Sequence, residues 1–495
     1  MAELILQALP YQRDSHDLIH CIGALPGAVC LDSGLGQQPE SRYDILTALP
    51  SKQLRLHKID DANVIEQRQG AKACWQPLSD QSCIFTAADS LLQHDRPSDS
   101  VINELSHLPF CGGVLACFGY DAAGNTPCRD ERSDVDDGHE LGEVLSQAPT
   151  ASCGLYQWAV VVDHECDTTS LFVLPTCPDV IRRQVMQTIC ELNGPDGPGL
   201  HDKNPHDTDK HTDQDFILHG AFQPQLSADQ YSAAFDRLKA YIVAGDCYQA
   251  NLAIPFVGRF CGEPLQAYLR LRQGSRSPFS AFFDTGDAQV LSLSPERFVS
   301  VNEREVVTQP IKGTRKRSLD PKIDKQRSDE LQNSEKDRAE NLMIVDLLRN
   351  DLGSLCETGS VQTRELFKLH SFSQVHHLIS TITGILPKGV SAFALLKRCF
   401  PGGSITGAPK IRAMQIIAEL EPLPRSVYCG SVMYCDYRGR MDSSISIRTL
   451  LCYQGHIFCW GGGGIVSDSE MAREYQEAYD KVSALMALVS AQPDS

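Results

Sequence analysis

Runs of alternating or β-branched residues recur through the C-terminal half of the chain, and they constrain its fold more than any other feature. They span residues 289–301, 305–311, 374–386, 430–436, 443–452 and 456–460. Helical patterns separate some of them, at about 335–352, 392–399, 409–420 and 469–489, with Pro409 suited to a first helical position. This order predicts an α+β fold, with large, mainly antiparallel sheets packed as a sandwich and helices on the outside.

The best-marked helix begins after residue 226. Ser227 and Gln230 form a capping-box pattern, and Leu226 and Tyr231 are placed for a hydrophobic staple. Apolar residues then recur at helical spacing, and Gly245 is a natural C-terminal stop.

A change of composition divides the chain. Residues 193–215 are rich in Gly, Pro, Asp and His and lack periodicity, which predicts a flexible linker or exposed loop. We therefore expect an N-terminal region over 1–192, with strand-like pieces at 27–31 and 158–162, and a second domain over 216–490. His201, His206 and His211 lie in the linker, where no helix or strand fixes their geometry, so a solvated loop is favoured over a metal site.

Charge and cysteine usage narrow the function classes. The formal net charge of −18 disfavours nonspecific nucleic-acid binding, so an anionic ligand would need locally placed Arg, Lys, glycine amides or a metal. The N-terminus does not resemble a signal peptide, and no apolar run is long enough to cross a bilayer. Nineteen cysteines without a Cys-x-x-Cys pair favour reduced core thiols and a cytoplasmic protein over zinc or disulfides.

Lys312 stands at the end of an apolar β-rich stretch, beside a glycine. A lysine in this position is either a surface charge or a buried amine with a chemical role. The acids, basic groups and glycines elsewhere in the C-terminal half favour the second interpretation.

The last predicted helix carries Glu474, Glu477 and Lys481 at spacings that place them on one face. Taken alone they indicate a solvated, salt-bridged face. Four glycines at 461–464, between a strand and this helix, predict a loop whose bare amides lie beside that face, although a mobile turn is the alternative. Glu340, on the helix over 335–352, adds a carboxylate of the kind that Mg²⁺ prefers, but spacing alone is weak evidence for pairing it with the last helix.

Three further residues have both a structural and a chemical interpretation. In the run over 443–452 the alternation places Arg448 on the polar face with serines, as a carboxylate clamp or an ordinary exposed arginine. Glu296 is a general acid if burial raises its pKa, and otherwise a partner of Arg297. His377 lies in a strand-like run, where a hydrogen-bonded core histidine is the more common explanation.

Taken together, these segments resemble the chorismate-utilising enzymes, in family order across about 228–485. The matching motifs are GDCYQANL at 245–252, SPERF at 294–298, PIKGT at 310–314, RAEN at 338–341, DLLRND at 346–351, His377, FPGGSITGAPK at 400–410, IRT at 447–449, the glycines and EYQE at 474–477. The N-terminal half matches more weakly, through LDSG at 31–34, SRYD at 41–44 and FGYD at 118–121.

The resemblance implies roles for particular residues and a chorismate-binding-enzyme fold, with an N-terminal region like that of anthranilate synthase component I. It implies Mg²⁺ held by Glu340 and Glu477, with Glu474 nearby. It implies a general acid, Glu296, and a nucleophile, Lys312, that attacks C2 of chorismate as the 4-hydroxyl leaves. Ammonia then enters at C4, and nearby cationic charge, the metal included, helps to keep the lysine neutral. The substrate-binding groups that it implies are Gly313, Thr314, Tyr428, Arg448, Lys481 and the amides of Gly462 and Gly463, and His377 is placed with the catalytic residues.

Two positions discriminate within the family. Members similar to anthranilate synthase carry alanine where this chain has Lys312, and members that add water carry a lysine where it has Gln249. Gln249 with Lys312 resembles the members that aminate chorismate at C4 on the way to 4-aminobenzoate and folate. Ser469 and Ala478 depart from the family pattern, and we expect neither to touch a proposed ligand.

The resemblance also implies a source of ammonia. The segment around Cys247 is similar to a glutaminase nucleophile loop but lacks its second glycine, so a separate glutaminase subunit is expected to supply ammonia. Two alternatives remain: anthranilate synthase component I, which Lys312 disfavours, and a non-catalytic, tryptophan-sensing subunit, which the complete set of acid, metal and lysine residues disfavours. The N-terminal motifs are similar to those that form a tryptophan pocket in relatives.

Overall fold

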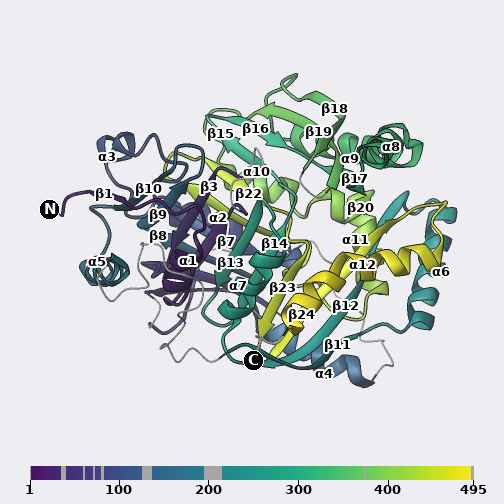
Figure 1. Cartoon of the computed structure of the whole chain (residues 1–495), viewed down its shortest axis with the longest axis horizontal. Coiled ribbons are helices and arrows are strands. Elements are labelled where there is room, and N and C mark those ends of the chain that lie inside the picture. The colour runs from purple at the N-terminus through teal and green to yellow at the C-terminus, as the bar shows by residue number, and fades with distance from the viewer. Residues whose placement is uncertain are drawn as a thin grey trace.

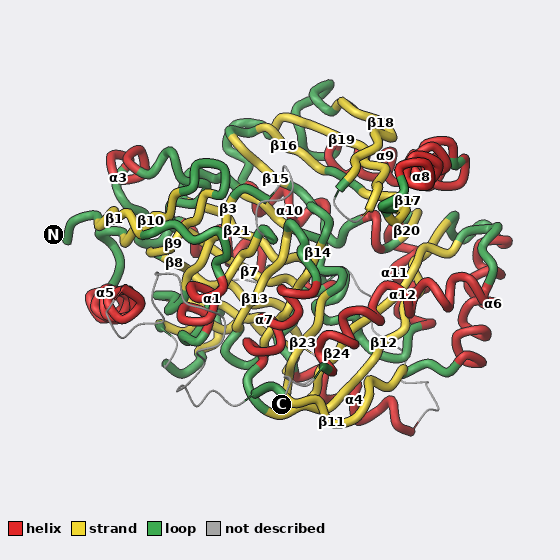
Figure 2. The backbone as a smooth tube through the Cα atoms, in the orientation of Figure 1, coloured by secondary structure: helices red, strands yellow, loops and turns green. Residues whose placement is uncertain are grey.

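The computed structural model describes residues 2–34, 41–59, 62–70, 73–79, 83–124, 136–193, 215–372 and 375–491. The predicted linker at 193–215, with its three histidines, lies outside these residues except at its two ends. The described residues form two sheets of twelve strands each, and every strand pairing is antiparallel. The predicted α+β fold with large antiparallel sheets is therefore confirmed (Figures 1 and 2).

The first sheet carries most of the long C-terminal strands. Its strands, in spatial order, are β1 (Ile5–Leu9), β10 (Thr168–Val173), β9 (Trp158–Asp163), β3 (Tyr43–Thr47), β2 (Val29–Asp32), β13 (Phe279–Asp284), β14 (Gln289–Ser294), β23 (Thr449–Tyr453), β24 (His456–Ile465), β12 (Gln249–Cys261) and β11 (Ile217–Pro224), with β20 (Gly407–Ala408) paired to β12.

The second sheet contains the strand that bears Lys312. Its strands, in spatial order, are β17 (Ile311–Lys316), β19 (Val375–Ile385), β16 (Glu305–Thr308), β15 (Ser300–Asn302), β22 (Met441–Ser443), β21 (Ser431–Asp436), β7 (Gly113–Phe118), β8 (Ala151–Tyr156), β4 (Lys52–Ile59), β5 (Ala62–Gln69) and β6 (Gln76–Pro77), with β18 (Gln362–Ser371) paired to β19.

Alternate residues of the first sheet face two different cores. Val29 and Phe283 belong to a core shared with the second sheet, whereas their neighbours Cys30 and Phe282 belong to a core shared with helices. The sheets thus pack face to face as a sandwich, with helices over the outer face of the first. That helical layer consists of α1 (His16–Gly23), α5 (Asp179–Asn193), α6 (Ala228–Ala244), α7 (Pro264–Gly274), α11 (Lys410–Leu420) and α12 (Met471–Ser490).

The remaining described helices lie outside that layer, and several of them contact strands of the second sheet. They are α2 (Ile84–Leu92), α3 (Asp99–Glu104), α4 (Asp136–Gln147), α8 (Pro321–Asn333), α9 (Glu335–Gly353) and α10 (Ala392–Cys399), with the short 3₁₀ helices η1 (Tyr120–Ala123) and η2 (Gly403–Ile405). Figure 1 shows α8 and α9 beside β17 and β19 at one end of the molecule, with β20 and α11 next to them.

Each sheet is built from both sides of the predicted division at residues 193–215. In the first sheet β2 pairs with β13, and in the second β7 pairs with β21. The N-terminal region therefore supplies strands to both layers that position the C-terminal motifs.

Several local predictions are confirmed, and three need correction. Both hydrogen bonds of the capping box join Ser227 and Gln230, and Gly245 ends α6 in the left-handed conformation. Pro409, in contrast, is the residue before α11, not its first position.

The predicted strand at 443–452 is interrupted. β22 ends at Ser443 and β23 begins at Thr449, and Arg448 between them has a φ of +50°. Alternation therefore does not set the direction of Arg448, because a left-handed residue breaks the period-two pattern of a strand.

The four glycines are also placed differently from the prediction. They lie inside β24, opposite residues 251–254 of β12, and not in a loop. Glycine is usually unfavourable within a strand, and its presence there marks a place where other groups approach the backbone closely. None of the described helices is long and apolar enough to cross a membrane.

Candidate active site

Lys312 is not a surface charge. Its Nζ lies 3.0 Å from Glu340 Oε1 on α9 and donates to the backbone carbonyl of Ser404 on η2 at 3.1 Å. Burial alone would lower the pKa of this lysine, but the charges of Glu340, Glu296 and Glu477 outweigh it and raise the pKa. These carboxylates thus favour the ammonium form of Lys312, and the expectation that nearby cationic charge keeps the amine neutral stays a prediction.

Glu296 follows β14 and is almost fully buried, with 6 % of its surface exposed. Its Oε1 accepts a hydrogen bond from the Ser404 hydroxyl at 3.0 Å. Burial raises its pKa, which was the condition for a general acid, although Lys312, Ser404 and Lys481 act in the opposite direction. The guanidinium of Arg297, the alternative partner, binds Asp442 and Gln309.

Gln249 lies on the other side of Glu340, at the start of β12. Its Nε2 donates to Glu340 Oε1 at 3.5 Å, a long contact, and its own Oε1 is buried with no hydrogen-bond partner among the described residues. An unpaired buried acceptor is costly, and an ordered water or a ligand is one explanation for it. Gln249 thus presents an unused acceptor next to the Lys312–Glu340 pair.

The glycines of β24 allow α12 and its carboxylates to approach the strand. A Cβ at Gly461 would lie 2.0 Å from the Ala478 carbonyl oxygen. A Cβ at Gly463 would lie 3.2 Å from Glu474 Oε2 and 3.5 Å from Glu477 Oε1, and one at Gly464 would lie 3.4 Å from Glu340 Oε1. The absence of side chains therefore brings the carboxylates of α9 and α12 to adjacent positions along one strand.

Beside these carboxylates, one edge of β24 has no partner strand among the described residues. The pairing with β23 ends at Cys459, while β12 continues along the other edge. The amides of Asn251 and Ala253 bind groups away from β24, so alternation directs the amide of Gly463 toward β12 and that of Gly462 to the open edge. Lys481 reaches the same edge, because its Nζ donates to the Gly462 carbonyl at 2.8 Å and pairs with Glu477 at 2.7 Å.

Ser469 corrects an expectation. Its hydroxyl donates to Glu474 Oε1 at 2.8 Å, so this departure from the family pattern does touch a proposed metal ligand. Burial raises the pKa of Glu474, the neighbouring Glu477 raises it further, and the serine opposes both. Ala478, the other departure, is fully buried against β24.

Arg448 and His377 lie on the side of the site formed by β17 and β19. Burial lowers the pKa of Arg448, and within the described part of the chain no ion pair involves its guanidinium. His377 Nδ1 lies 2.8 Å from the Thr314 hydroxyl, and burial together with Arg448 lowers its pKa to about 4. The histidine is therefore neutral at pH 7, and a half-buried cation without a counter-ion beside it suits a carboxylate ligand.

Two predicted substrate-binding residues have less direct positions. Gly313 precedes Thr314 on β17, at an irregularity in the pairing with β19. Tyr428 is 3 % exposed, and its ring stacks on Trp460 at 6.0 Å, directly before the glycines. Arg425, which forms a fully buried ion pair with Glu421, also packs on the Tyr428 ring.

The donor chemistry fits Mg²⁺. Within the described ranges, no group of three or more Asp, Glu, His or Cys side chains is close enough to hold a metal, and Lys312 and Lys481 pair with carboxylates of the proposed set. Mg²⁺ needs only one or two protein carboxylates and completes its shell with water or substrate oxygens. Glu340 and Glu477, with Glu474 beside them, would provide these at the glycine strand.

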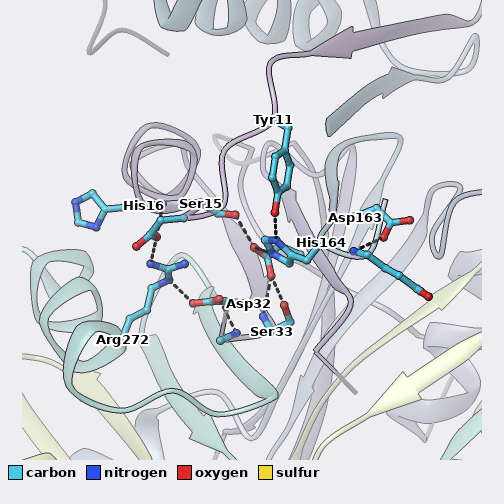
Figure 3. Close-up of polar contacts among 12 residues, drawn as sticks. Tyr11, Ser15, His16, Asp32, Ser33, Asp163, His164 and Arg272 are labelled. Atoms are coloured by element: carbon cyan, nitrogen blue, oxygen red, sulfur yellow. Dashed lines mark hydrogen bonds and ion pairs between the residues drawn. The ribbon is translucent and has the colours of Figure 1, made fainter. Parts of the chain in front are cut away.

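A second polar cluster lies in the N-terminal region (Figure 3). Asp44 is fully buried and accepts hydrogen bonds from the hydroxyls of Ser15 and Ser33, from the amide of Ser33 and from His164 at 2.5–2.9 Å. Beside it, Arg272 pairs with Asp32 and Asp14. The motifs at 31–34 and 41–44 thus build an interior network, which the sequence did not predict.

A pocket opens next to this cluster, between the two sheets. It is lined by Asp32 and Tyr43, by residues 278–281 at β13, and by residues from β21 and β22 that include Tyr434 and Asp442. The weak N-terminal motifs therefore border a cavity distinct from the Lys312 site.

Comparison with known proteins places this geometry in a family context. A model of the chorismate binding enzyme family matches residues 66–487. The chain is 40% identical to aminodeoxychorismate synthase component 1 of Klebsiella aerogenes, covering 97% of each chain, and 40% identical to that of Escherichia coli K12, covering 93% of each.

Solved structures agree with this assignment of the fold. Anthranilate synthase component I from Streptococcus pneumoniae superposes with a TM-score of 0.72 at 27% identity, covering 90% of this chain and 92% of that one. The menaquinone-specific isochorismate synthase from Escherichia coli, at 15% identity, covers 99% of this chain and 95% of its own with a TM-score of 0.67, and shares the fold.

Proposed function

Because the chain belongs to the chorismate-binding enzyme family, we propose that it converts chorismate and ammonia into 4-amino-4-deoxychorismate. The relatives named as aminodeoxychorismate synthase component 1 support this reaction, since they match nearly the whole chain. The observation that carries the proposal is the position of Lys312, whose amine is buried between Glu340 and Ser404 and close to Glu296.

In the first half of the proposed reaction, the Lys312 amine forms a bond to C2 of the chorismate ring. The ring double bond shifts, the C4–oxygen bond breaks, and Glu296 gives its proton to the departing hydroxyl, which leaves as water. Burial raises the pKa of Glu296, which supports its role as the acid. Arg448 and Lys481 bind substrate carboxylates, and the amide of Gly462 lies on the same open edge.

In the second half, ammonia attacks C4 and the C2–nitrogen bond to Lys312 breaks, which restores the amine. Gln249 and Lys312 both contact Oε1 of Glu340. The Oε1 of Gln249, which has no partner among the described residues, can accept a hydrogen bond from an entering N–H group. The enolpyruvyl group stays on the ring, so a separate lyase must act before 4-aminobenzoate enters folate synthesis.

Lys312 must lose a proton before it attacks, and the carboxylates around it oppose that loss. Mg²⁺ bound by Glu340 and Glu477 would neutralise these carboxylates and polarise the ring carboxylate of the substrate. With fewer anionic groups facing Lys312, its pKa would fall, which favours the neutral, nucleophilic amine.

Ammonia is supplied, in this proposal, by a separate glutaminase subunit. The printed name "component 1" of the relatives supports a partner component, and Cys247 is buried at the segment that is similar to a glutaminase loop. Burial raises the pKa of Cys247, which does not suit a nucleophilic thiol.

Product identification tests the proposal. The purified chain with chorismate, Mg²⁺ and ammonium at raised pH should form 4-amino-4-deoxychorismate, and adding the glutaminase should make glutamine an effective nitrogen donor. Anthranilate with released pyruvate would identify the alternative activity instead. Full use of glutamine by the chain alone would contradict the need for a partner.

The pocket lined by Asp32 and Tyr43 supports a second, separate proposal, that tryptophan binds in the N-terminal region. Tight tryptophan binding without any chorismate turnover would favour a sensing subunit over an enzyme. Turnover with or without tryptophan binding would leave the enzyme assignment in place.

A further inference from the structure

Ser404 contacts both groups that the proposed reaction uses at the ring. Its hydroxyl donates to Glu296 Oε1 at 3.0 Å, and its backbone carbonyl accepts from Lys312 Nζ at 3.1 Å. The residue is 8 % exposed, so water does not replace these contacts easily. One residue thus fixes the distance between the acid and the amine.

The 3₁₀ turn that carries Ser404 is held on several sides. Arg425 donates to the carbonyl of Ile405 at 3.0 Å, and the amide of Asn251 on β12 donates to the carbonyl of Thr406 at 2.8 Å. A Cβ at Gly403 would lie 2.5 Å from Leu347 of α9, so the turn is packed directly against the helix that carries Glu340. Ser404 therefore sits on a rigid support, as a positioning group requires.

The chemistry of the two contacts suits groups that change protonation. A hydroxyl can donate to a carboxylate and accept from a carboxylic acid, so Ser404 can hold Glu296 before and after proton transfer. A backbone carbonyl accepts equally from an ammonium and from an amine. When Glu340 binds another partner, the Ser404 carbonyl remains a fixed acceptor for Lys312.

We propose that Ser404 is a positioning residue that aligns the Lys312 amine at C2 and the Glu296 acid at the C4 hydroxyl, the two ends of the reacting C2–C3–C4 unit. This inference rests on the proposed function. It assigns to Ser404 a role in the rate of ring activation, not in substrate affinity.

Other charged or titratable groups face Glu296 as well: Lys312 on β17, Lys481 on α12 and Cys429 before β21. The hydroxyl of Ser404 acts with the two lysines to lower the pKa of Glu296. Removal of the hydroxyl should therefore raise that pKa. Because the acid must be protonated to act, the basic limb of kcat/KM should move to higher pH.

The test compares Ser404→Ala, Ser404→Thr and Ser292→Ala in the full chain with chorismate, Mg²⁺ and ammonium. Ser292 is a matched control, because its buried hydroxyl binds Thr449 and contacts neither Glu296 nor Lys312. Rates of chorismate consumption and product identity are both recorded, and thermal melting checks the fold.

Ser404→Ala should lower kcat by about tenfold, the scale of one lost hydrogen bond, with KM unchanged and the basic limb displaced upward. Ser404→Thr should restore most of the rate, because it keeps the hydroxyl. The inference is overturned if Ser404→Ala matches Ser292→Ala in kcat and in the basic limb, or if only KM changes. A wild-type product other than 4-amino-4-deoxychorismate would refute the proposed function, while the serine comparison still decides the role of Ser404.

Discussion

The two polar clusters of this molecule differ in how fully their charged groups are paired. In the N-terminal network, Asp44 accepts four hydrogen bonds in a fully buried position. Around Lys312, in contrast, Arg448 has no ion pair among the described residues, the Gln249 Oε1 is unpaired, and lysines occupy the proposed metal ligands.

This difference indicates what each cluster does. A buried carboxylate that accepts four hydrogen bonds holds strands and a helix in one arrangement, because a change at Asp44 or its donors leaves a buried polar group without a partner. Nη2 of Arg272 is the group in this network that has no hydrogen bond among the described residues. In a site with unpaired groups, some polar and charged side chains gain their stabilising contacts only when a ligand binds. Substitutions should therefore affect folding in the first cluster and turnover in the second.

The largest effect is expected at Lys312. Lys312→Ala should reduce amination by about 10⁴-fold or more, the scale seen when a covalent nucleophile is removed. Lys316→Ala is the control, because this lysine is exposed on the same strand. Ammonia-dependent formation of the aminated product at the wild-type rate, without a rise in anthranilate, would show that the nucleophile is wrongly assigned.

Asp44→Asn should instead lower the stability of the fold and leave the turnover of each folded molecule unchanged. The substitution leaves donors of Ser33 and His164 imperfectly paired in the interior, and the free energy of unfolding should fall by about 3 kcal/mol. Urea unfolding measures the loss, with exposed Asp229→Asn as the control. If Asp44→Asn has the same free energy of unfolding as the control but a lower turnover per folded molecule, the structural role of the N-terminal network is contradicted.

Arg448→Met sharpens the contrast from the other side. No carboxylate of the described protein loses an ion pair, so stability should be kept, whereas KM for chorismate should rise by roughly 10- to 100-fold. Arg473→Met, on the exposed face of α12, should leave KM unchanged. A large loss of stability with normal KM would make Arg448 a structural residue.

The pH dependence of stability tests the pairing of His164 with Asp44 in the N-terminal network. Burial opposes the charged form of His164, but the hydrogen bond and charge of Asp44 outweigh it and raise the histidine pKa. The stabilisation by the charged pair is complete below the ordinary histidine pKa of about 6.5 and is lost as pH rises through the folded-state pKa. His164→Asn should therefore cost about 1–2 kcal/mol near pH 6 and less at higher pH, as measured by urea unfolding. A cost that is constant or grows with pH would contradict this pairing.

The smallest effect is expected at Ser469. Ser469→Ala removes the hydrogen bond to Glu474, so Mg²⁺ affinity measured by calorimetry should weaken by less than about tenfold.

Glu340→Gln removes a proposed ligand and should raise the Mg²⁺ requirement more than Ser469→Ala does. An unchanged metal titration for Glu340→Gln would remove that residue from the ligand set.

The sequence predicted those features that depend on local chemistry. The cap of α6 follows from a short motif and the structure has it, whereas the motif around Glu296 leaves its burial open and the structure shows it buried. The glycines of β24 were predicted as a loop, because isolated glycine runs usually break strands, while here a helix packs onto them. Contacts that depend on the tertiary fold were not predicted either. Asp44 and His164 are 120 residues apart, and Ser469 meets Glu474 only because of the turn into α12.

Intact-protein and peptide mass spectrometry tests the covalent role of Lys312 most directly. Wild-type protein mixed with chorismate and Mg²⁺, without ammonia, and quenched in acid should show the ring attached to the peptide that contains Lys312. Adding ammonium before the quench should remove the adduct and release the aminated product. Efficient amination with no modified Lys312 at any quench time, or with the ring attached to another residue, would contradict the account.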